Sequence, residues 1–546
     1  MSLTGTPVVP GIGAGPVVRP GERVQTPSDE PVGDKDATVA AFAAAAQAVA
    51  ERLTARAAHA SGAAAEVLQA TAGMAADKGL ATFVGKHAAT AGPATATTKA
   101  VEELAAMFTA AGGLMAERVT DLHDVRDRVV AELLGVPEPG VPEPDEPSVL
   151  FADDLAPADT AGLDPARITG IAIRLGGTTS HTAIIARQLG IPCVVGVASL
   201  PLEGGATALV DGGTGEVVLD PDPADVAARQ AADEARRSAG ASWTGPGRTA
   251  DGHAVQVLAN VQDGPGAVVA AAEPVEGFGL YRTELSFLDR SAEPTVDEQA
   301  AIYGEVFAAA GAGAKVVVRT LDAGSDKPLK FADMGDEPNP ALGVRGLRIA
   351  DSRPELLDHQ LDAIAQAAGR SEADVWVMAP MVAVPSEAAA LAEKLHSRGL
   401  TAGVMIETPS AALLADRVLE HVDFVSIGTN DLSQYTFAAD RMASSLSHLT
   451  DPWQPALLVL IERVAQAGQA AGKPVGVCGE AAADPLLACV LAGLGVTSLS
   501  CAATAVRSVG AQLSSVTLAQ CQEAARGALA AADPQAAREA ARAALS

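Results

Sequence analysis

From about residue 247 to the C-terminal end, short apolar runs that resemble strands alternate with helical stretches. The strand-like runs cover residues 255–260, 277–280, 315–319, 375–380, 402–407, 424–428 and 474–479. A charged or polar residue stands where each run stops. Repeated βα units of this length are typical of a (β/α)8 barrel, and such barrels place their chemistry at the C-terminal ends of the strands. We therefore predict a (β/α)8 barrel over residues 247–546.

The first half of the chain contains two kinds of sequence. Short apolar runs with turn residues between them predict a small α/β module. These runs are 7–18, 149–152, 168–173, 192–196 and 208–210. Residues 36–134 are instead rich in alanine, nearly free of proline and apolar at helical spacing, which predicts an inserted helical bundle. The proline-rich stretch 137–147 breaks any helix and marks the end of the bundle.

A chain of 546 residues exceeds what one hydrophobic core usually supports. The sequence therefore predicts a multidomain α/β protein. Its expected parts are an α/β domain formed by 1–20 and 145–221, an inserted α-helical domain at 21–144, a charged helical linker at 222–246, and the barrel at 247–546. Within the α/β domain, residues 181–189 are expected to form a helix after a glycine-rich turn.

The charge balance restricts the partners of this chain. The sequence has 67 acidic and 38 basic residues, for a formal net charge of −29, which repels nucleic acid and anionic membranes. A small anionic substrate therefore needs a local cluster of arginines. No uncharged apolar run reaches the length of a membrane span, and the N-terminus lacks the features of a signal peptide. The five cysteines are scattered without metal-ligand spacing, so we expect a cytoplasmic protein.

A histidine at a predicted helix start is the first candidate for chemistry. Two glycines and three hydroxyl residues directly precede His181. Backbone amides and the helix dipole at such a position favour a phosphate group, and an imidazole can act as a nucleophile. The alternative is an ordinary Ser/Thr capping turn with an incidental histidine. The residues alone leave both interpretations open.

The expected barrel carries a second set of candidates at the ends of its strands. They lie in the segments 280–284, 318–327, 343–348, 405–409, 428–435 and 440–441. Any single arginine among them could form a surface ion pair instead. Several guanidinium and carboxylate groups at one barrel mouth favour a site for an anion and a divalent cation. Cys478 ends a further predicted strand, where a buried structural thiol is the alternative interpretation.

Residues 176–187 resemble the phosphohistidine segment of the phosphoenolpyruvate (PEP)-utilising enzymes. They match the pattern Gly-Gly-x-Thr-Ser-His-x-Ala-Ile-x-Ala-Arg at every fixed position. The resemblance implies that His181 carries a phosphoryl group on Nε2. It also implies that Thr178 or Thr179 holds or orients that group.

The barrel region resembles the PEP-binding domain of the same family. The substrate-binding residues that this resemblance implies are Arg282, Arg319, Arg345, Asn430, Asp431 and Arg441. It implies Mg²⁺ as the cofactor, with Glu407 and Asp431 as its protein ligands. It also implies that Cys478 donates the proton that converts the enolate of PEP into pyruvate.

The alanine-rich region distinguishes between members of the family. Pyruvate phosphate dikinase and PEP synthase have a large nucleotide-binding domain, for which too little sequence precedes His181. Residues 36–134 instead resemble the phosphocarrier-binding domain of enzyme I of the sugar phosphotransferase system, most clearly at 117–128. That resemblance implies a homodimer that phosphorylates itself from PEP and passes the group to the histidine phosphocarrier protein HPr, the first step of sugar uptake. The sequence 500–504 departs from the family pattern near the dimer-forming region.

Two alternatives to this function stay open from the sequence. One is a dikinase-like enzyme that uses a separate nucleotide-binding subunit. The other is a regulator that binds PEP without turnover. Under the leading interpretation His181 must reach both the barrel and the carrier, so we expect the domains to swivel about residues 222–246 and about the joints of the bundle.

Overall fold

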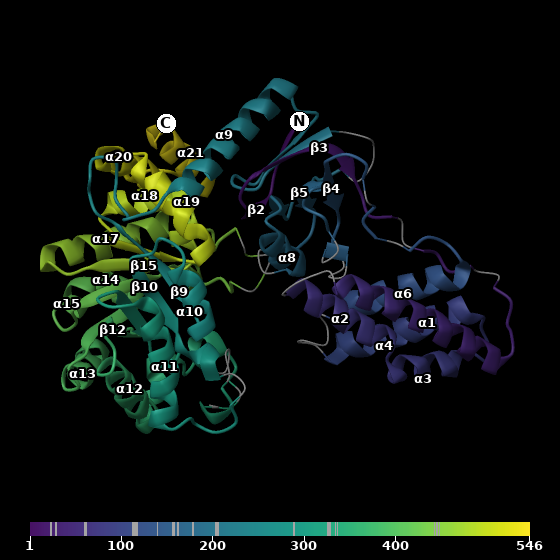
Figure 1. Ribbon diagram of the computed structural model, residues 1–546, viewed down its shortest axis with the longest axis horizontal. Coiled ribbons are helices and arrows are strands. Elements are labelled where there is room, and N and C mark those ends of the chain that lie inside the picture. Colours follow the sequence, from purple (N-terminus) through teal and green to yellow (C-terminus); the bar gives the residue numbers. More distant parts are fainter. Residues whose placement is uncertain are drawn as a thin grey trace. The chain divides into compact units, whose positions relative to one another are not determined.

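The computed structural model divides into two compact units, Met1–Asp233 and Glu234–Ser546 (Figure 1). The boundary lies within helix α9 (Pro223–Ser242), in the segment expected to be a linker. The structure describes all residues except 22–23, 28–29, 59–62, 112–117, 139, 143, 156–158, 161–162, 177–179, 202–206, 288–289, 325–328, 333–334, 336, 442, 444–445, 447 and 546.

The second unit is built on a closed barrel of eight parallel strands, which confirms the predicted fold class. The strands are β9 (Gln256–Val261), β10 (Gly277–Arg282), β11 (Lys315–Arg319), β12 (Asp374–Ala379), β13 (Thr401–Ile406), β14 (Phe424–Gly428), β15 (Val475–Cys478) and β16 (Ser498–Cys501). Seven of them match the predicted runs. The eighth, β16, was not predicted because its sequence Ser-Leu-Ser-Cys lacks the β-branched residues that favour strands. It closes the barrel by pairing with both β15 and β9.

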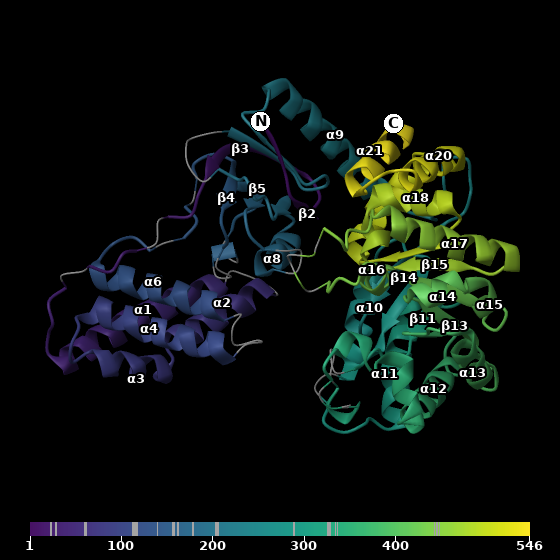
Figure 2. The ribbon, with the colours of Figure 1, turned by 180° about the vertical axis from the view of Figure 1, so that it is seen from behind.

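Helices surround the barrel strands (Figure 2). They are α10 (Gly264–Ala271), α11 (Val296–Ala310), α12 (Pro354–Ala368), α13 (Pro385–His396), α14 (Pro409–Leu413), α15 (Ala415–Leu419), α16 (Thr429–Phe437), α17 (Pro455–Ala471), α18 (Pro485–Leu494), α19 (Val506–Ser514), α20 (Leu518–Leu529) and α21 (Pro534–Leu545). The main hydrophobic core lies between these helices and the strands. A smaller cluster fills the barrel interior with Leu280, Val317, Met378, Met405, Phe424 and Cys478. The fold is thus a packed barrel whose ends are free for chemistry.

The first unit contains one eight-stranded sheet with the order β1-β8-β7-β3-β4-β5-β6-β2. The strands are β1 (Ser2–Thr4), β2 (Thr6–Val9), β3 (Ile12–Val18), β4 (Ser148–Ala152), β5 (Ile168–Ile173), β6 (Cys193–Val195), β7 (Thr207–Asp211) and β8 (Glu216–Leu219). Strands β3 to β6 pair in parallel, and the remaining pairs are antiparallel. Helix α8 (His181–Leu189) lies between β5 and β6 in the chain, as the sequence predicts.

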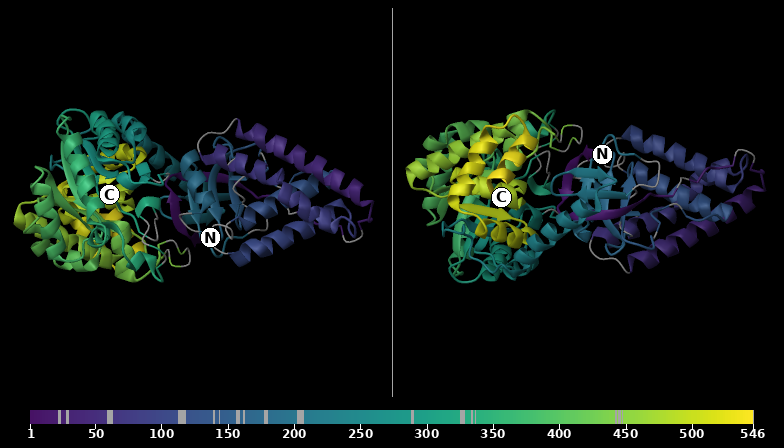
Figure 3. Two further views of the ribbon diagram at one scale, coloured as in Figure 1. Left: turned by 90° about the horizontal axis from the view of Figure 1, so that it is seen from below. Right: turned by 90° about the horizontal axis from the view of Figure 1, so that it is seen from above.

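The inserted residues of the first unit form a bundle whose helices lie side by side (Figure 3). These helices are α1 (Lys35–Ala57), α2 (Ala63–Ala75), α3 (Lys78–His87), α4 (Pro93–Ala111) and α6 (Val119–Leu134). Many of the buried positions are alanines, whose small side chains let the helices pack closely. Ile185 of α8 also packs into this core. No described helix combines the length and the apolar character that crossing a membrane requires.

A buried arginine connects the bundle to the sheet domain. Arg128 of α6 is 1% exposed, and its guanidinium donates to Asp124 (Nε–Oδ2, 2.9 Å) and to Glu138 (Nη1–Oε2, 3.2 Å). It also pairs with Asp159, which follows β4. Burial, together with the nearby Asp124 carboxylate, raises the pKa of Asp159 to about 6. One cation therefore balances several carboxylates at this junction.

Replacing Arg128 should destabilise the first unit strongly. The substitution Arg128→Met leaves buried carboxylates without their cation, and we expect the free energy of unfolding at pH 8 to fall by about 3 kcal/mol. Arg118→Met at the start of the same helix is the control, because the Arg118 side chain is half exposed and lies 3.5 Å from its ion-pair partner Asp121. Chemical denaturation measures both changes. Equal small losses in the two variants would show that the buried cluster does not stabilise the fold.

Candidate active site

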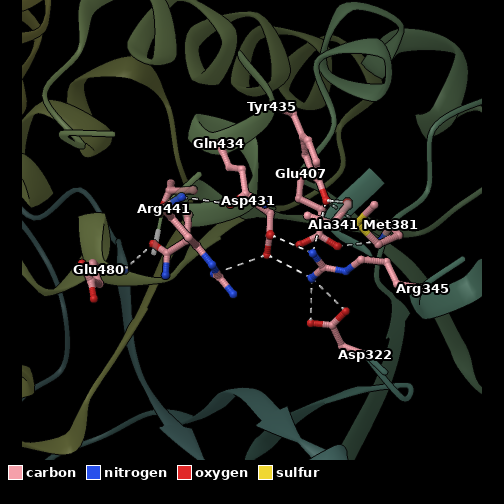
Figure 4. A network of polar contacts seen from close by, with 12 residues as sticks. Asp322, Ala341, Arg345, Met381, Glu407, Asp431, Gln434, Tyr435, Arg441 and Glu480 are labelled. Carbon is pink, nitrogen blue, oxygen red and sulfur yellow. Dashed lines mark hydrogen bonds and ion pairs between the residues drawn. The ribbon is translucent and has the colours of Figure 1, made fainter. Parts of the chain in front are cut away.

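The barrel brings the predicted residues of the second unit to one end. Because the strands are parallel, the residues that end them meet at the same rim. Arg282, Arg319 and Cys478 are the last residues of β10, β11 and β15. Glu407 directly follows β13, and Asn430 and Asp431 lie in the first turn of α16 after β14. Arg345 and Arg441 come from loops, and Figure 4 shows both guanidinium groups directed toward Asp431.

Arg345 lies between two carboxylates (Figure 4). Its Nη2 is 3.2 Å from Asp322 Oδ1, and its Nη1 is 3.2 Å from Asp431 Oδ1. Nη1 also donates to the Tyr435 hydroxyl at 3.2 Å. Arg345 and Asp322 are both completely buried. The guanidinium thus fixes the orientation of Asp431 by charge-assisted hydrogen bonds.

Arg319 is held by a second pair of carboxylates. It forms ion pairs with Glu284 and, at 3.2 Å, with Asp322. These two carboxylates outweigh the effect of burial and raise the pKa of Arg319 above its ordinary value. The buried Nε has no hydrogen-bond partner among the described residues. A buried donor without a partner is costly, so this atom favours an anionic ligand.

Glu284 and Asp322 were not predicted as site residues. Both lie in segments that the sequence analysis singled out, two residues after Arg282 and three after Arg319. The signal that could have identified them is the need of a buried arginine for a buried counter-ion. The Met381 N–H, which donates to Glu407, gives no signal in the sequence because every residue except proline has such a group.

Glu407 is buried with one carboxylate oxygen unsatisfied. The Met381 N–H donates to Oε1 at 2.6 Å (Figure 4). Met381 has a φ of 63°, a left-handed conformation that is uncommon for a residue with a side chain. Oε2 accepts no hydrogen bond from any described residue. Burial, with the carboxylates of Asp431 and Asp322 nearby, raises the pKa of Glu407 to about 8.

The remaining predicted substrate-binding residues are Arg441 and Asn430. Arg441 places Nη1 3.7 Å from Asp431 Oδ2, and its backbone N–H donates to Gln434 Oε1 at 3.1 Å. Asn430 Oδ1 accepts from the Glu480 N–H at 3.4 Å. Gly479 beside it has a φ of 114°, and a Cβ there would lie 2.8 Å from Thr429 Oγ1, so this position needs glycine.

Cys478 presents a buried thiol at the same rim. It is 1% exposed, its Sγ accepts from the Ser426 hydroxyl at 3.4 Å, and it donates to the Ile427 carbonyl at 3.6 Å. Burial raises the pKa of the Cys478 thiol, although the Ser426 hydrogen bond and Arg319 act in the opposite direction. The group is therefore a neutral thiol at pH 7, able to give up a proton.

His181 belongs to the other unit, where it is the first residue of α8. Ser180 caps this helix, since its hydroxyl accepts from the Ala183 N–H at 3.3 Å. The capping turn considered from the sequence is thus present, and it is compatible with a phosphate site at the same helix start. Thr178 and Thr179 lie outside the described residues.

Glu407 and Asp431 could supply two of the oxygen ligands of a divalent cation. No cluster of three or more His, Cys, Asp or Glu side chains suited to a metal occurs within the described part of the chain. Glu407 Oε2 is nevertheless a buried oxygen that no described residue contacts by a hydrogen bond, and Asp431 lies close enough to raise the pKa of Glu407. Mg²⁺ commonly takes one or two carboxylates and completes its shell with water and substrate phosphate. The two residues fit a cation of this kind.

Arginines and carboxylates converging on the C-terminal rim of a parallel barrel define an enzyme that binds a small anion. Family models agree with this class. The PEP-binding domain of the PEP-utilising enzymes matches residues 236–518, their mobile domain matches 144–215, and their N-terminal domain matches 4–118.

Sequence comparison gives the narrower family. A phosphoenolpyruvate-protein phosphotransferase of Streptomyces coelicolor is 50% identical over 100% of this chain and 99% of its own length. Proteins of that name from Staphylococcus carnosus and Bacillus subtilis are 41% and 39% identical, covering 72% and 74% of this chain and 71% and 74% of their own lengths. The chain belongs to the phosphoenolpyruvate-protein phosphotransferase family of PEP-utilising enzymes.

The buried Glu407 carboxylate should make stability depend on pH when no divalent cation is present. Its folded-state pKa of about 8 lies above the ordinary value of 4.5. The unfolded chain therefore releases this proton first, and stability falls as the pH rises from 4.5 through 8. Glu407→Gln removes this dependence. We therefore expect the free energy of unfolding of the variant, relative to that of the native protein, to increase by about 2 kcal/mol from pH 6 to pH 9.

Chemical denaturation in a chelator at both pH values measures this gain. Glu420→Gln, which changes an exposed carboxylate of the same barrel, is the control and should behave like the native protein. A gain that is the same at pH 6 and pH 9 would contradict a raised pKa at Glu407.

Proposed function

We propose that this enzyme transfers the phosphoryl group of PEP to His181 and then to the histidine phosphocarrier protein HPr. The observation that carries the proposal is the juxtaposition of a buried arginine and carboxylate network with a neutral thiol at one barrel rim. PEP has both a phosphate and a carboxylate, which bidentate guanidinium groups recognise. The thiol then supplies the proton that the product requires.

The arginines provide complementary roles in substrate binding. Arg319 has a buried Nε without a partner among the described groups, and Arg282 pairs with it in register on the neighbouring strand. Arg441 approaches Asp431 from the side opposite to Arg345 (Figure 4). We assign the binding of the phosphate and the carboxylate of PEP to Arg282, Arg319, Arg441 and Asn430. Arg345, whose guanidinium faces Asp322 and Asp431, supports the site instead of contacting substrate.

Glu407 and Asp431 would hold Mg²⁺. The free Oε2 of Glu407 and the fixed carboxylate of Asp431 are the oxygen ligands that support this assignment. The cation would supply positive charge that offsets the negative charge of the transferring phosphoryl group. The Met381 N–H orients Glu407. The arginines would neutralise the phosphoryl oxygens that the cation does not contact.

Cys478 would complete the conversion of PEP. Loss of the phosphoryl group breaks the phosphorus–oxygen bond and leaves the enolate of pyruvate. The enolate carbon takes the proton of the Cys478 thiol, forming a carbon–hydrogen bond and leaving a thiolate. Burial favours the protonated thiol beforehand, which supports its role as the acid.

The domain assignment follows from this function. We propose that 1–20 and 145–221 carry the phosphohistidine, that 21–144 bind HPr, and that the barrel domain 247–546 binds PEP and mediates a homodimer. The two compact units and the separate family models support this division. His181 and the barrel rim belong to different units, and we propose that the units move about the linker 222–246 to bring them together. The five free, buried cysteines support a reducing cytoplasm as the location.

Labelled PEP tests the phosphorylated residue. With Mg²⁺, the native protein should gain an acid-labile, base-stable phosphoryl group, and His181→Ala should gain none because the nucleophile is absent. His396→Ala, which changes an exposed histidine of the barrel, should be labelled like the native protein. Labelling needs no nucleotide, and a requirement for ATP would instead favour a dikinase. Unlabelled native protein would contradict the proposed function.

Cys478→Ala tests the proton donor. This variant keeps the arginines and carboxylates, so PEP should bind with nearly native affinity, whereas pyruvate should form at least about a hundredfold more slowly. Binding is measured by calorimetry and turnover by pyruvate release. Cys501→Ala is the control, because Cys501 is an equally buried thiol of β16. Native turnover by Cys478→Ala would rule out the thiol as the acid.

A further inference from the structure

The thiol at the barrel rim has a second contact whose role the proposed function leaves unexplained. After each turnover the Cys478 thiolate must regain a proton before the next enolate forms. Its two hydrogen-bond partners are the Ile427 carbonyl and the Ser426 hydroxyl. A carbonyl has no proton to give. Among the residues that the structure describes, Ser426 is the one that offers the sulfur an O–H group.

Ser426 lies in the middle of β14 and faces the barrel interior. It is 5% exposed, and it lines a cavity on the side away from the substrate rim. The cavity is also lined by Ser498, Ser500, Lys315 and Trp376, from strands β16, β11 and β12. It has room for about one water molecule. The hydroxyl therefore stands between the thiol and a small cavity whose lining combines hydroxyl groups with apolar side chains such as Val317 and Phe424.

Glycine keeps this space open. Gly476 of β15 lies opposite Ser426 in the strand register. A Cβ at Gly476 would lie 2.8 Å from Ser498 Oγ and 3.6 Å from Ser426 Oγ, so any side chain would fill the gap between the two hydroxyls. The cavity reaches the start of β11, where the Lys315 ammonium donates to Gln256 at 2.9 Å and lies 4.0 Å from the Trp376 ring centre. Polar groups thus extend toward the N-terminal end of the barrel.

We propose that Ser426 relays a proton to the Cys478 thiolate from a water molecule in this cavity, by a route separate from the substrate rim. The sulfur–hydrogen bond forms as the Ser426 oxygen–hydrogen bond breaks, and Ser426 takes a proton from the water. The water takes a proton from solvent at the N-terminal end as it gives one to Ser426, so that no free hydroxide forms in the cavity. Ser426 is a positioning and relay residue that acts through Cys478. This inference rests on the proposed function.

Separating the first turnover from later ones tests the relay. Cys478 starts protonated, so the first pyruvate needs no relay, whereas every later one does. Quenched-flow measurements use the full-length chain with PEP, Mg²⁺ and saturating HPr. Ser426→Val loses the hydrogen bond that lowers the thiol pKa, so its first pyruvate should form somewhat more slowly than in the native protein, and later ones should be slowed at least about tenfold more than the first. Ser426→Thr has the same shape as valine but keeps the hydroxyl, and it should restore the later rate.

The outcomes distinguish the relay from its alternatives. Equal later rates in the Val and Thr variants would overturn the relay, with the proton then coming from the substrate rim. Equal slowing of the first and later turnovers would also overturn it, because Ser426 would then only orient the thiol. Ser426→Ala repeats the test in a smaller side chain if the valine does not fold. A native protein that forms no phosphohistidine contradicts the proposed function itself, and the relay with it.

Discussion

The charge balance around Arg345 is the constraint on which the rest of the barrel site depends. Its guanidinium faces both Asp322 and Asp431, and Asp322 in turn pairs with Arg319. Removing one member of such a buried network leaves an opposite charge without its partner, which is costly. The network therefore holds Arg319, proposed to bind substrate, and Asp431, proposed to bind the metal, in fixed positions. This preorganisation is what electrostatic stabilisation of a transferring group requires.

The net charge of this rim favours the joint binding of cation and substrate. The rim holds four arginines (Arg282, Arg319, Arg345, Arg441) and four carboxylates (Glu284, Asp322, Glu407, Asp431), of which Glu407 stays protonated below about pH 8. A phosphate brings about −1.5 to −2 charges, and the carboxylate of PEP adds another. A divalent cation that displaces the Glu407 proton brings the total close to neutral. Each ligand alone would leave a larger imbalance in a buried site, so each should increase the affinity for the other.

Much of this site could be predicted from the sequence because strand order and strand ends are local features. Arg319, Glu407 and Cys478 each stand at or just after the end of an apolar run, and a parallel barrel brings those ends together. Residues whose role depends on tertiary contacts were missed: Glu284 and Asp322 are recognisable only as counter-ions of buried arginines. The Met381 N–H acts through a backbone angle of 63° that no side chain encodes. Strand β16 was missed because barrel closure, not its own sequence, makes it a strand.

The interior of the barrel explains why a thiol, and not a carboxylic acid, suits the position proposed to donate the proton. Cys478 belongs to an apolar cluster with Leu280, Met378 and Met405, where a carboxylate would require a counter-ion of its own. A thiol is nearly apolar when protonated, so it can be buried there at little cost and still release a proton to a strongly basic enolate. The thiolate that results is the unstable state in this environment. Its charge is met by Arg319 and by the Ser426 hydroxyl, and the same apolar surroundings that stabilise the thiol therefore favour its rapid return to the protonated form.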